Sequence, residues 1–402
     1  MVLRATCASS SFIISLKPHS LAVSRDDEHV VSWDLGGRLY SVYRGDVTWR
    51  RGLSGDVLEK RGSGASRSRT WLTSTRADAV AEDAASFARE VAEALSTKAW
   101  HWSAPIEPVV AQLVGSHLRL CSGFDGARAR SDADRFAAVY RPIGILPPDQ
   151  YLSLVVQATE GCSFNTCTFC DLYHDGYRVK SVDQFRTHVE EVRRYLGASI
   201  NLRSRGIFLG AANALAVPMA TLVPLFETLV EELDAIPRGV CAFVDGFTGT
   251  KKTAADYRLL SHLGLRRVYV GLESGHDLLL AFIRKPGLAA DAIETVKRVK
   301  AAGVQVGVIV MTGLGGEPFA DAHVADTIAA VNQMQLGEGD LIYFSDLVEI
   351  AGTPYPRIAE REAIGSLSAE NRAMQRGAIR CGLRFDGPGP KFATYDIREF
   401  VY

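Results

Sequence analysis

From about residue 150 to residue 350 the sequence alternates short, apolar, β-branched runs with amphipathic stretches. The runs predict six strands, at residues 152–157, 206–209, 240–244, 267–271, 304–311 and 340–345. Helical spacing of apolar residues predicts helices near 182–197, 219–235, 253–263, 288–302 and 321–335. Strands separated by helices pair in parallel, because each connection crosses over the sheet. We therefore expect an α/β fold, a partial (β/α)6 TIM-like barrel; an open doubly wound sheet is the alternative, and both place chemistry at the C-terminal strand ends.

The first third of the chain has a different pattern. Short strands are predicted at residues 12–16, 21–24, 29–33, 38–43 and 47–51, and a helix at 76–98. The basic, Gly/Ser-rich stretch 61–70 predicts a linker. We accordingly expect a small β-rich accessory region (1–65), a linker and helical region (66–140), the barrel (141–350) and a C-terminal extension packing on the barrel (351–402).

Composition narrows the class of protein. The hydrophobic fraction of 47% and the charged fraction of 23% are typical of globular domains. A formal net charge of -1 gives no bulk attraction for a polyanion. No apolar run approaches the roughly 20 residues that span a bilayer, and the N-terminal apolar patch is shorter than the apolar region of about 7–15 residues in a signal peptide. We expect a cytoplasmic protein without a membrane partner.

Three of the seven cysteines fall within nine residues. Cys162, Cys167 and Cys170 have the spacing C-x4-C-x2-C and follow the first strand of the repeating region. Three thiolates on one loop can bind three irons of a [4Fe–4S] cube and leave the fourth iron open to a small molecule. The alternatives are a zinc site completed by His174 and a set of reduced core thiols. The other cysteines are far apart in sequence, and we expect them to be small buried residues: Cys7, Cys121, Cys241 and Cys381.

Polar residues and glycines follow the later strands. Gly210 and Asn213 come after the second strand, and Asp245 ends the third, where it either faces a ligand or caps the next turn. The fourth strand ends in Gly-Leu-Glu-Ser-Gly (271–275), and Lys-Pro-Gly (285–287) follows a short helical stretch. Parallel strands end at one edge of a sheet, so we expect these residues around one site.

Together the cysteine loop and these turns resemble the radical S-adenosylmethionine (radical SAM) superfamily over roughly residues 150–360. The likeness is greatest to the branch that contains the elongator catalytic subunit and oxygen-independent coproporphyrinogen oxidase. The commonest spacing in the superfamily is C-x3-C-x2-C, so the loop here is one residue longer. The resemblance implies that Cys162, Cys167 and Cys170 ligate a [4Fe–4S] cluster and act catalytically through it, with S-adenosylmethionine as the second cofactor.

The resemblance also implies contacts to S-adenosylmethionine from Phe169, Gly210, Asn213, Asp245, Glu273, Ser274 and Lys285. Phe169 approaches the adenine edge, and the backbone at Gly210 binds the methionine ammonium. Glu273 accepts hydrogen bonds from the ribose hydroxyls. Lys285 pairs with the methionine carboxylate, a role for which Arg284 is the rival.

The function implied is reductive cleavage of S-adenosylmethionine, followed by hydrogen abstraction from an unknown substrate by the 5′-deoxyadenosyl radical. The electron would come from an external flavodoxin- or ferredoxin-like donor of low potential. The alternatives are a non-catalytic cluster- or cofactor-binding, chaperone-like protein on the same fold, and an RNA-modifying radical SAM enzyme.

Basic residues between 44 and 69 predict either a solvated edge or an RNA contact: Arg44, Arg50, Arg51, Arg61, Arg67 and Arg69. Because the net charge is nearly zero, we expect the solvated edge and no nucleic-acid partner.

Overall fold

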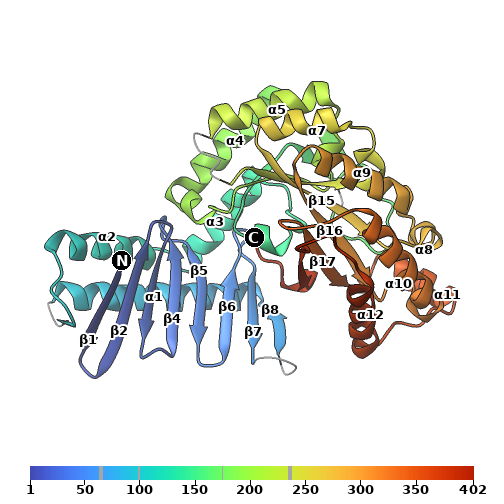
Figure 1. The fold of residues 1–402 in the computed structure, drawn as a ribbon. Helices are drawn as coiled ribbons and strands as arrows, with labels where there is room; N and C mark the ends of the chain where they lie inside the picture. Colours follow the sequence, from blue (N-terminus) through green and yellow to red (C-terminus); the bar gives the residue numbers. More distant parts are fainter. Residues whose placement is uncertain (63–66, 98–99, 174, 234–237) are drawn as a thin grey trace. The chain divides into compact units, whose positions relative to one another are not determined.

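The computed structural model describes residues 1–62, 67–97, 100–173, 175–233 and 238–402, and the chain divides into two compact units (Figure 1). The first unit comprises Met1–Arg141, Glu191–Ser204 and Val401–Tyr402. The second comprises Pro142–Glu190 and Arg205–Phe400. Residues 63–66 of the predicted linker and the candidate zinc ligand His174 lie outside the described residues.

The first unit is built on a nine-stranded antiparallel sheet in the order β8-β7-β6-β5-β4-β3-β2-β1-β9. Its strands are β1 (Val2–Cys7), β2 (Ser10–Lys17), β3 (Ser20–Arg25), β4 (His29–Asp34), β5 (Leu39–Arg44), β6 (Val47–Arg51), β7 (Val57–Arg61), β8 (Ser68–Trp71) and β9 (His101–Trp102). Successive strands pair, so β1 to β8 form a meander. Strand β8 lies in the stretch that was predicted to be a linker. No strand was predicted there because its four residues are exposed and have no alternation of apolar and polar residues.

One face of this sheet is covered by helices. They are α1 (Ser74–Ser96), α2 (Pro108–Ser122) and α3 (Gly126–Val139), and Figure 1 shows α1 and α2 on the same side of the strands. Alternate strand residues such as Ile14, Val23 and Trp33 pack in one core with Phe87 and Leu118 of the helices. The side-chain period of two therefore separates this apolar face from an opposite face that carries a mixture of polar, basic and apolar residues.

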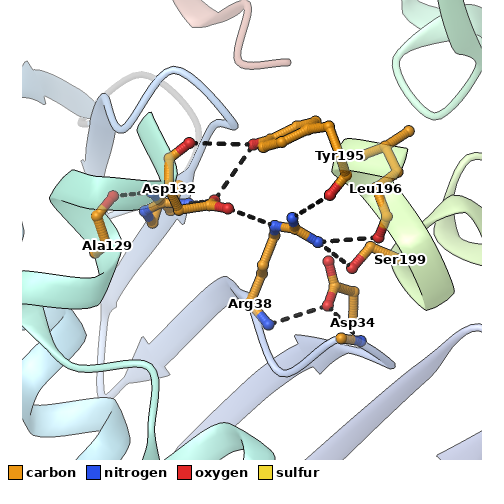
Figure 2. A network of polar contacts seen from close by, with 9 residues as sticks. Asp34, Arg38, Ala129, Asp132, Tyr195, Leu196 and Ser199 are labelled. Carbon is orange, nitrogen blue, oxygen red and sulfur yellow. Dashed lines mark hydrogen bonds and ion pairs between the residues drawn. The ribbon is translucent and has the colours of Figure 1, made fainter. Parts of the chain in front are cut away.

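A buried ionic network joins three distant segments of the first unit (Figure 2). Arg38, at the start of β5, donates from Nε to Asp132 Oδ1 of α3 at 2.9 Å. Its other nitrogens donate to the carbonyl of Tyr195 at 2.6 Å and to the hydroxyl of Ser199 at 2.5 Å. Tyr195 lies in the last turn of α4 (Val182–Leu196), and Ser199 belongs to the 3-10 helix η3 (Gly197–Leu202). One guanidinium thus fastens residues 191–204 to the sheet and to α3.

Other charges complete the network. Arg51 approaches the second oxygen of Asp132 at 3.7 Å and donates to the carbonyl of Ala129 at 2.8 Å. Asp34 accepts the backbone N–H groups of Gly36 and Arg38, and burial raises the pKa of its carboxyl group. Asp132 is only 2% exposed, so its charge depends on the two arginines.

We predict that Asp132→Ala lowers the free energy of unfolding of the first unit by about 3–5 kcal/mol, because it removes the carboxylate that both buried guanidinium groups contact. Urea titration followed by tryptophan fluorescence measures this, since all five tryptophans lie in this unit. The matched control is Asp78→Ala, which breaks an ion pair with Arg130 whose arginine side chain is 59% exposed. We expect that control to cost less than about 1 kcal/mol. Equal losses in both variants would contradict the assignment.

The second unit contains a seven-stranded parallel sheet in chain order. Its strands are β10 (Leu154–Gln157), β13 (Ile207–Gly210), β14 (Val240–Asp245), β15 (Leu265–Glu273), β16 (Gln305–Thr312), β17 (Leu341–Asp346) and β18 (Lys391–Tyr395). The helices are α4, shared with the first unit, α5 (Met219–Glu232), α6 (Gly246–Gly249), α7 (Ala254–His262), α8 (Asp277–Phe282), α9 (Ala289–Ala301), α10 (Gly316–Gln333), α11 (Pro354–Arg361) and α12 (Ala369–Gly382). A small antiparallel pair, β11 (Thr159–Glu160) and β12 (Arg178–Val179), flanks the cysteine loop.

This arrangement confirms the predicted α/β fold with a partial TIM-like barrel. All six predicted strands are present, and the seventh, β18, was not predicted. Its sequence Lys-Phe-Ala-Thr-Tyr lacks the β-branched run that marks the others. The C-terminal segment therefore adds a strand to the sheet. The expectation of burial was wrong for Cys381, which is exposed, while Cys121 and Cys241 are buried.

The N-terminal end of the parallel sheet is closed by hydrogen bonds to Asp149, in the 3-10 helix η2 (Pro148–Gln150). Its carboxylate accepts from the hydroxyls of Tyr269 at 2.6 Å and Tyr343 at 2.7 Å, and from Arg267 at 3.0 Å. The same tyrosine rings pack against each other inside the sheet, with centroids 6.4 Å apart. The cavity described below lies at the other end, where the strands terminate. Among the described residues, no helix combines the length and apolar character needed to cross a membrane.

Candidate active site

A cavity of about 200 Å³ lies at the C-terminal ends of the parallel strands. It is lined by predicted site residues from five different loops: Cys162, Cys167, Phe169, Cys170, Asn213, Asp245, Glu273 and Lys285. Apolar side chains from β14 and β16, including Phe243, Ile309 and Met311, form the wall between them. The cavity therefore brings together side chains that are more than 120 residues apart in the sequence.

The cysteine loop is held in place by backbone hydrogen bonds. Thr168 donates its N–H to the carbonyl of Ile283 at 2.9 Å, and the N–H of Tyr355 donates to the carbonyl of Thr168 at 2.9 Å. The hydroxyl of Thr166 donates to the carbonyl of Arg284 at 3.0 Å. These bonds tie the second and third cysteines to the segment that immediately precedes Lys285. At the start of the loop Gly161 has φ +67°, and a Cβ there would clash with the backbone of Asp175.

The three thiols suit a polynuclear iron site. Burial raises the pKa of the Cys167 thiol to about 11 against the opposing effect of Lys285, and burial also raises the pKa of Cys170. Thiolates there require a compensating positive charge, which a metal centre supplies. Among the described residues, no three His, Cys, Asp or Glu side chains are close enough to hold a single metal ion. Each thiolate of a [4Fe–4S] cube binds a different iron, so the three sulfurs need not converge on one point.

Asn213 and Asp245 form the second wall. Asn213 is 3% exposed and donates from Nδ2 to Asp245 and, at 2.8 Å, to the hydroxyl of Ser163 in the cysteine loop. Its carbonyl oxygen accepts the N–H of Asp245 at 3.1 Å. Asp245 also caps α6, accepting the N–H of Thr248 at 2.8 Å. Asp245 was predicted either to face a ligand or to cap the next turn. In the structure the same side chain caps α6 and lines the cavity.

Glu273 and Lys285 form an ion pair in the cavity wall, with Nζ and Oε1 3.3 Å apart and both side chains nearly buried. Burial opposes the charge on Lys285, but Glu273, Cys167 and Asp245 outweigh it and raise the pKa of the lysine. Glu273 has φ +59° at a bulge where the register between β15 and β16 shifts. Any side chain at Gly271 would clash with the Glu273 carboxylate, so the glycine lets this carboxylate fold back beside the lysine.

Three other candidates lie outside the cavity lining. Gly210 ends β13, and the protein atoms around it leave room for a Cβ. Arg284 contributes its carbonyl to Thr166, whereas the neighbouring Lys285 faces the cavity. Ser274 is fully buried behind the turn, where its hydroxyl accepts the N–H of His276 at 3.0 Å. Direct contacts of Gly210 and Ser274 with a ligand stay predictions.

Sequence reasoning missed the part of the cavity formed by the last two strands. Ser345 and Asp346 at the end of β17 and Tyr395 at the end of β18 line it. Asp346 accepts a hydrogen bond from Thr312 at 2.6 Å and pairs with Arg372 at 3.3 Å and Arg376 at 2.5 Å. Asp346 follows the C-terminal end of a predicted strand, as Asp245 does, so the same argument could have identified it as a site residue. Tyr395 carried no such signal, because its strand was not predicted.

Behind the Glu273 turn, His323 is fully buried, and its Nδ1 lies 2.8 Å from the Ser274 hydroxyl. Burial lowers the pKa of His323 from 6.5 to about 4. The direction of this hydrogen bond depends on the ring tautomer, but protonation of the ring would place a charge in a fully buried position. The native turn therefore depends on an uncharged His323.

We predict that His323 makes stability depend on pH. Because its folded pKa lies below its unfolded pKa, the stabilisation is complete above about pH 6.5 and is lost as the pH falls towards 4. At pH 5 the loss amounts to about 2 kcal/mol relative to pH 7.5. Urea unfolding followed by circular dichroism at both pH values should show this loss in the native chain and not in His323→Gln. Parallel pH profiles for the two proteins would refute the role of His323.

Comparisons with known proteins agree with this geometry. Residues 156–328 match the family model described as the radical SAM superfamily. No curated protein matches the chain by sequence. One similar solved structure is the cobalamin-dependent S-adenosylmethionine radical enzyme OxsB with aqua-cobalamin and S-adenosylmethionine bound, at 14% identity and a TM-score of 0.39, over 64% of this chain and 33% of that one. The chain thus spans about a third of the length of OxsB.

Two further structures are similar over more of their own length. HydG, a maturase of the [FeFe]-hydrogenase, has 13% identity and a TM-score of 0.40, over 80% of this chain and 71% of that one. The coproporphyrinogen III oxidase HemN from Escherichia coli has 14% identity and a TM-score of 0.39, over 61% of this chain and 54% of that one. The more specific branch suggested by the sequence stays a prediction. The family match includes the cysteine loop and the ends of five parallel strands, and it identifies residues 156–328 as a radical SAM domain, which belongs to a superfamily whose cofactors are a [4Fe–4S] cluster and S-adenosylmethionine.

Proposed function

We propose that the protein cleaves S-adenosylmethionine reductively and uses the resulting 5′-deoxyadenosyl radical to abstract a hydrogen atom from its substrate. The observation that carries the proposal is the single cavity shared by the three thiols and by candidate ligand side chains from four other loops. Cys162, Cys167 and Cys170 would hold the cluster. When bound, the cluster supplies the electron that cleaves the sulfonium.

The charged side chains of the cavity would bind the polar groups of S-adenosylmethionine. Glu273 accepts hydrogen bonds from the ribose hydroxyls, and the Lys285 ammonium donates to the methionine carboxylate. The ion pair between them keeps both charges compensated before the ligand arrives. Asp245 offers a carboxylate to the methionine ammonium, and its bonds to Asn213 and Thr248 fix its orientation.

The apolar wall would protect the radical. Phe169, Phe243, Ile309 and Met311 line the cavity, and such side chains exclude water from a reactive centre. The electron would come from an external flavodoxin- or ferredoxin-like donor in the cytoplasm, because the cavity lining contains only the three clustered cysteines. Ser345, Asp346 and Tyr395, on the strands farthest from β10, would face the substrate.

The first test is cysteine-dependent formation of 5′-deoxyadenosine. Anaerobically reconstituted protein, supplied with dithionite and S-adenosylmethionine, should produce it, and the triple variant Cys162→Ala/Cys167→Ala/Cys170→Ala should not. Cys381→Ala is the matched control, because this thiol is exposed and outside the cavity lining. An iron-loaded protein that yields no 5′-deoxyadenosine would instead favour a non-catalytic cluster-binding protein.

The second test concerns ligand affinity. We expect Glu273→Gln and Lys285→Met each to weaken S-adenosylmethionine binding by about 10- to 100-fold, because each removes a charged partner worth about 1.5–3 kcal/mol. Isothermal titration of iron-loaded protein measures the dissociation constant, and iron analysis verifies that the cluster is retained. Glu294→Gln, in a surface pair with Arg298, should leave the affinity unchanged. Loss of iron without loss of affinity per cluster would show a structural role only.

A further inference from the structure

The face of the nine-stranded sheet opposite the helices has an unusual distribution of charge. Direct pairing places residues of β1 to β8 in two continuous rows on this face, one from Arg4 to Arg69 and one from Val2 to Trp71. Each row takes one residue from each strand. The only charged residues in the two rows are basic: Arg4, Arg50, Lys60 and Arg69.

Aromatic side chains lie among these basic residues. Tyr43, in the first row, is 41% exposed, and Trp71, in the second row, is 45% exposed. The guanidinium of Arg50 lies over the ring of Tyr40, 5.3 Å from its centroid. A groove of about 700 Å³ runs along this part of the sheet, lined by Tyr43, Thr48, Arg50, Lys60 and Arg67, with Asp46 at one turn.

The formal charge of the chain is divided unequally between the two units. The first unit has 22 Lys and Arg against 17 Asp and Glu, a formal charge of +5, whereas the second has 23 against 29, a charge of -6. The whole-chain value of -1 averages these two. A charge asymmetry between parts of a chain is typical of proteins that bind polyanions.

We propose that this face, at strands β5 to β8, binds a single-stranded nucleic acid. Tyr43 on β5 and Trp71 on β8 would each stack on a base, and Arg50, Lys60, Arg67 and Arg69 would contact phosphates. The two aromatic residues are three strands apart, about 14 Å at a strand spacing of about 4.8 Å, which suits bases that are not adjacent in an extended strand. A duplex hides its base faces, so it cannot use these rings.

A lipid surface would use the basic side chains of this face but would not need two exposed aromatic rings three strands apart. Stacking on exposed aromatic side chains contributes about 1–3 kcal/mol per base and tolerates any sequence. The combination of an exposed ring and cations in the groove with a second exposed ring, Trp71, on the same face therefore favours single-stranded nucleic acid. The inference goes beyond S-adenosylmethionine cleavage, because the binding requires neither the cluster nor the cavity.

The test uses the full-length, iron-loaded protein and fluorescence anisotropy of a labelled oligouridine of about 12 nucleotides, within the usual site size of such surfaces. A deoxyuridine strand of the same length distinguishes RNA from DNA. The variant Lys60→Glu/Arg69→Glu should weaken binding at least about tenfold and reduce the slope of log affinity against log salt by about 1.4, or 0.7 per lost phosphate contact. The variant Tyr43→Ala/Trp71→Ala should weaken binding at least about tenfold without changing that slope.

The matched control is Arg89→Glu/Arg119→Glu, two exposed arginines on the helices of the opposite face. It makes the same change in net charge and should leave binding within about twofold. All three variants should produce 5′-deoxyadenosine at the native rate, which shows that they fold and separates this proposal from the proposed function. No salt-dependent binding by the native protein, an equal loss in the control, or binding to phosphatidylserine vesicles in place of the oligonucleotide would overturn the proposal.

Discussion

The candidate site depends on one constraint, the parallel pairing of strands β10 and β13 to β18. Each strand returns to the same edge through a crossover connection, so all seven carboxyl ends open at one end of the sheet. Residues as distant in sequence as Cys162 and Tyr395 line one cavity for this reason. At the opposite end the Asp149 carboxylate accepts hydrogen bonds from two tyrosine hydroxyls that lie inside the sheet.

Within the barrel, the polar groups of the site are held in position because most of them make a second hydrogen bond in addition to lining the cavity. Asp245 caps α6 and lines the cavity, and Asn213 links it to the cysteine loop. The backbone of the cysteine loop is bonded to the segment that presents Lys285. A displaced thiol would therefore disturb the lysine as well. Such shared support holds a first layer of ligands in position before the cosubstrate binds.

Sequence reasoning found the parts of the fold that repeat a local signal. The β-branched runs identified six strands of the barrel, and the cysteine spacing identified the loop. It did not find β18, because Lys391–Tyr395 has no apolar alternation, and so it missed Tyr395 in the cavity wall. Spacing also does not show that Glu273 lines the cavity at a bulge while its neighbour Ser274 is buried outside the cavity lining, so the predicted contact of Ser274 with the ligand stays a prediction. The network around Arg38 joins residues 94 and 161 positions apart, which no local pattern encodes.

The net charge of the whole chain conceals a difference between its two units, whose formal charges are +5 and -6. The cavity lining contains four carboxylates, on Asp171, Asp245, Glu273 and Asp346, against the single ammonium of Lys285. Asp346 is paired with Arg372 and Arg376, and the remaining excess of carboxylates suits the sulfonium and ammonium groups of the proposed ligand. A polyanion is attracted instead to the carboxylate-free rows of the antiparallel sheet. Cation recognition and phosphate recognition require opposite fields, and a chain that performs both has to place them on separate surfaces.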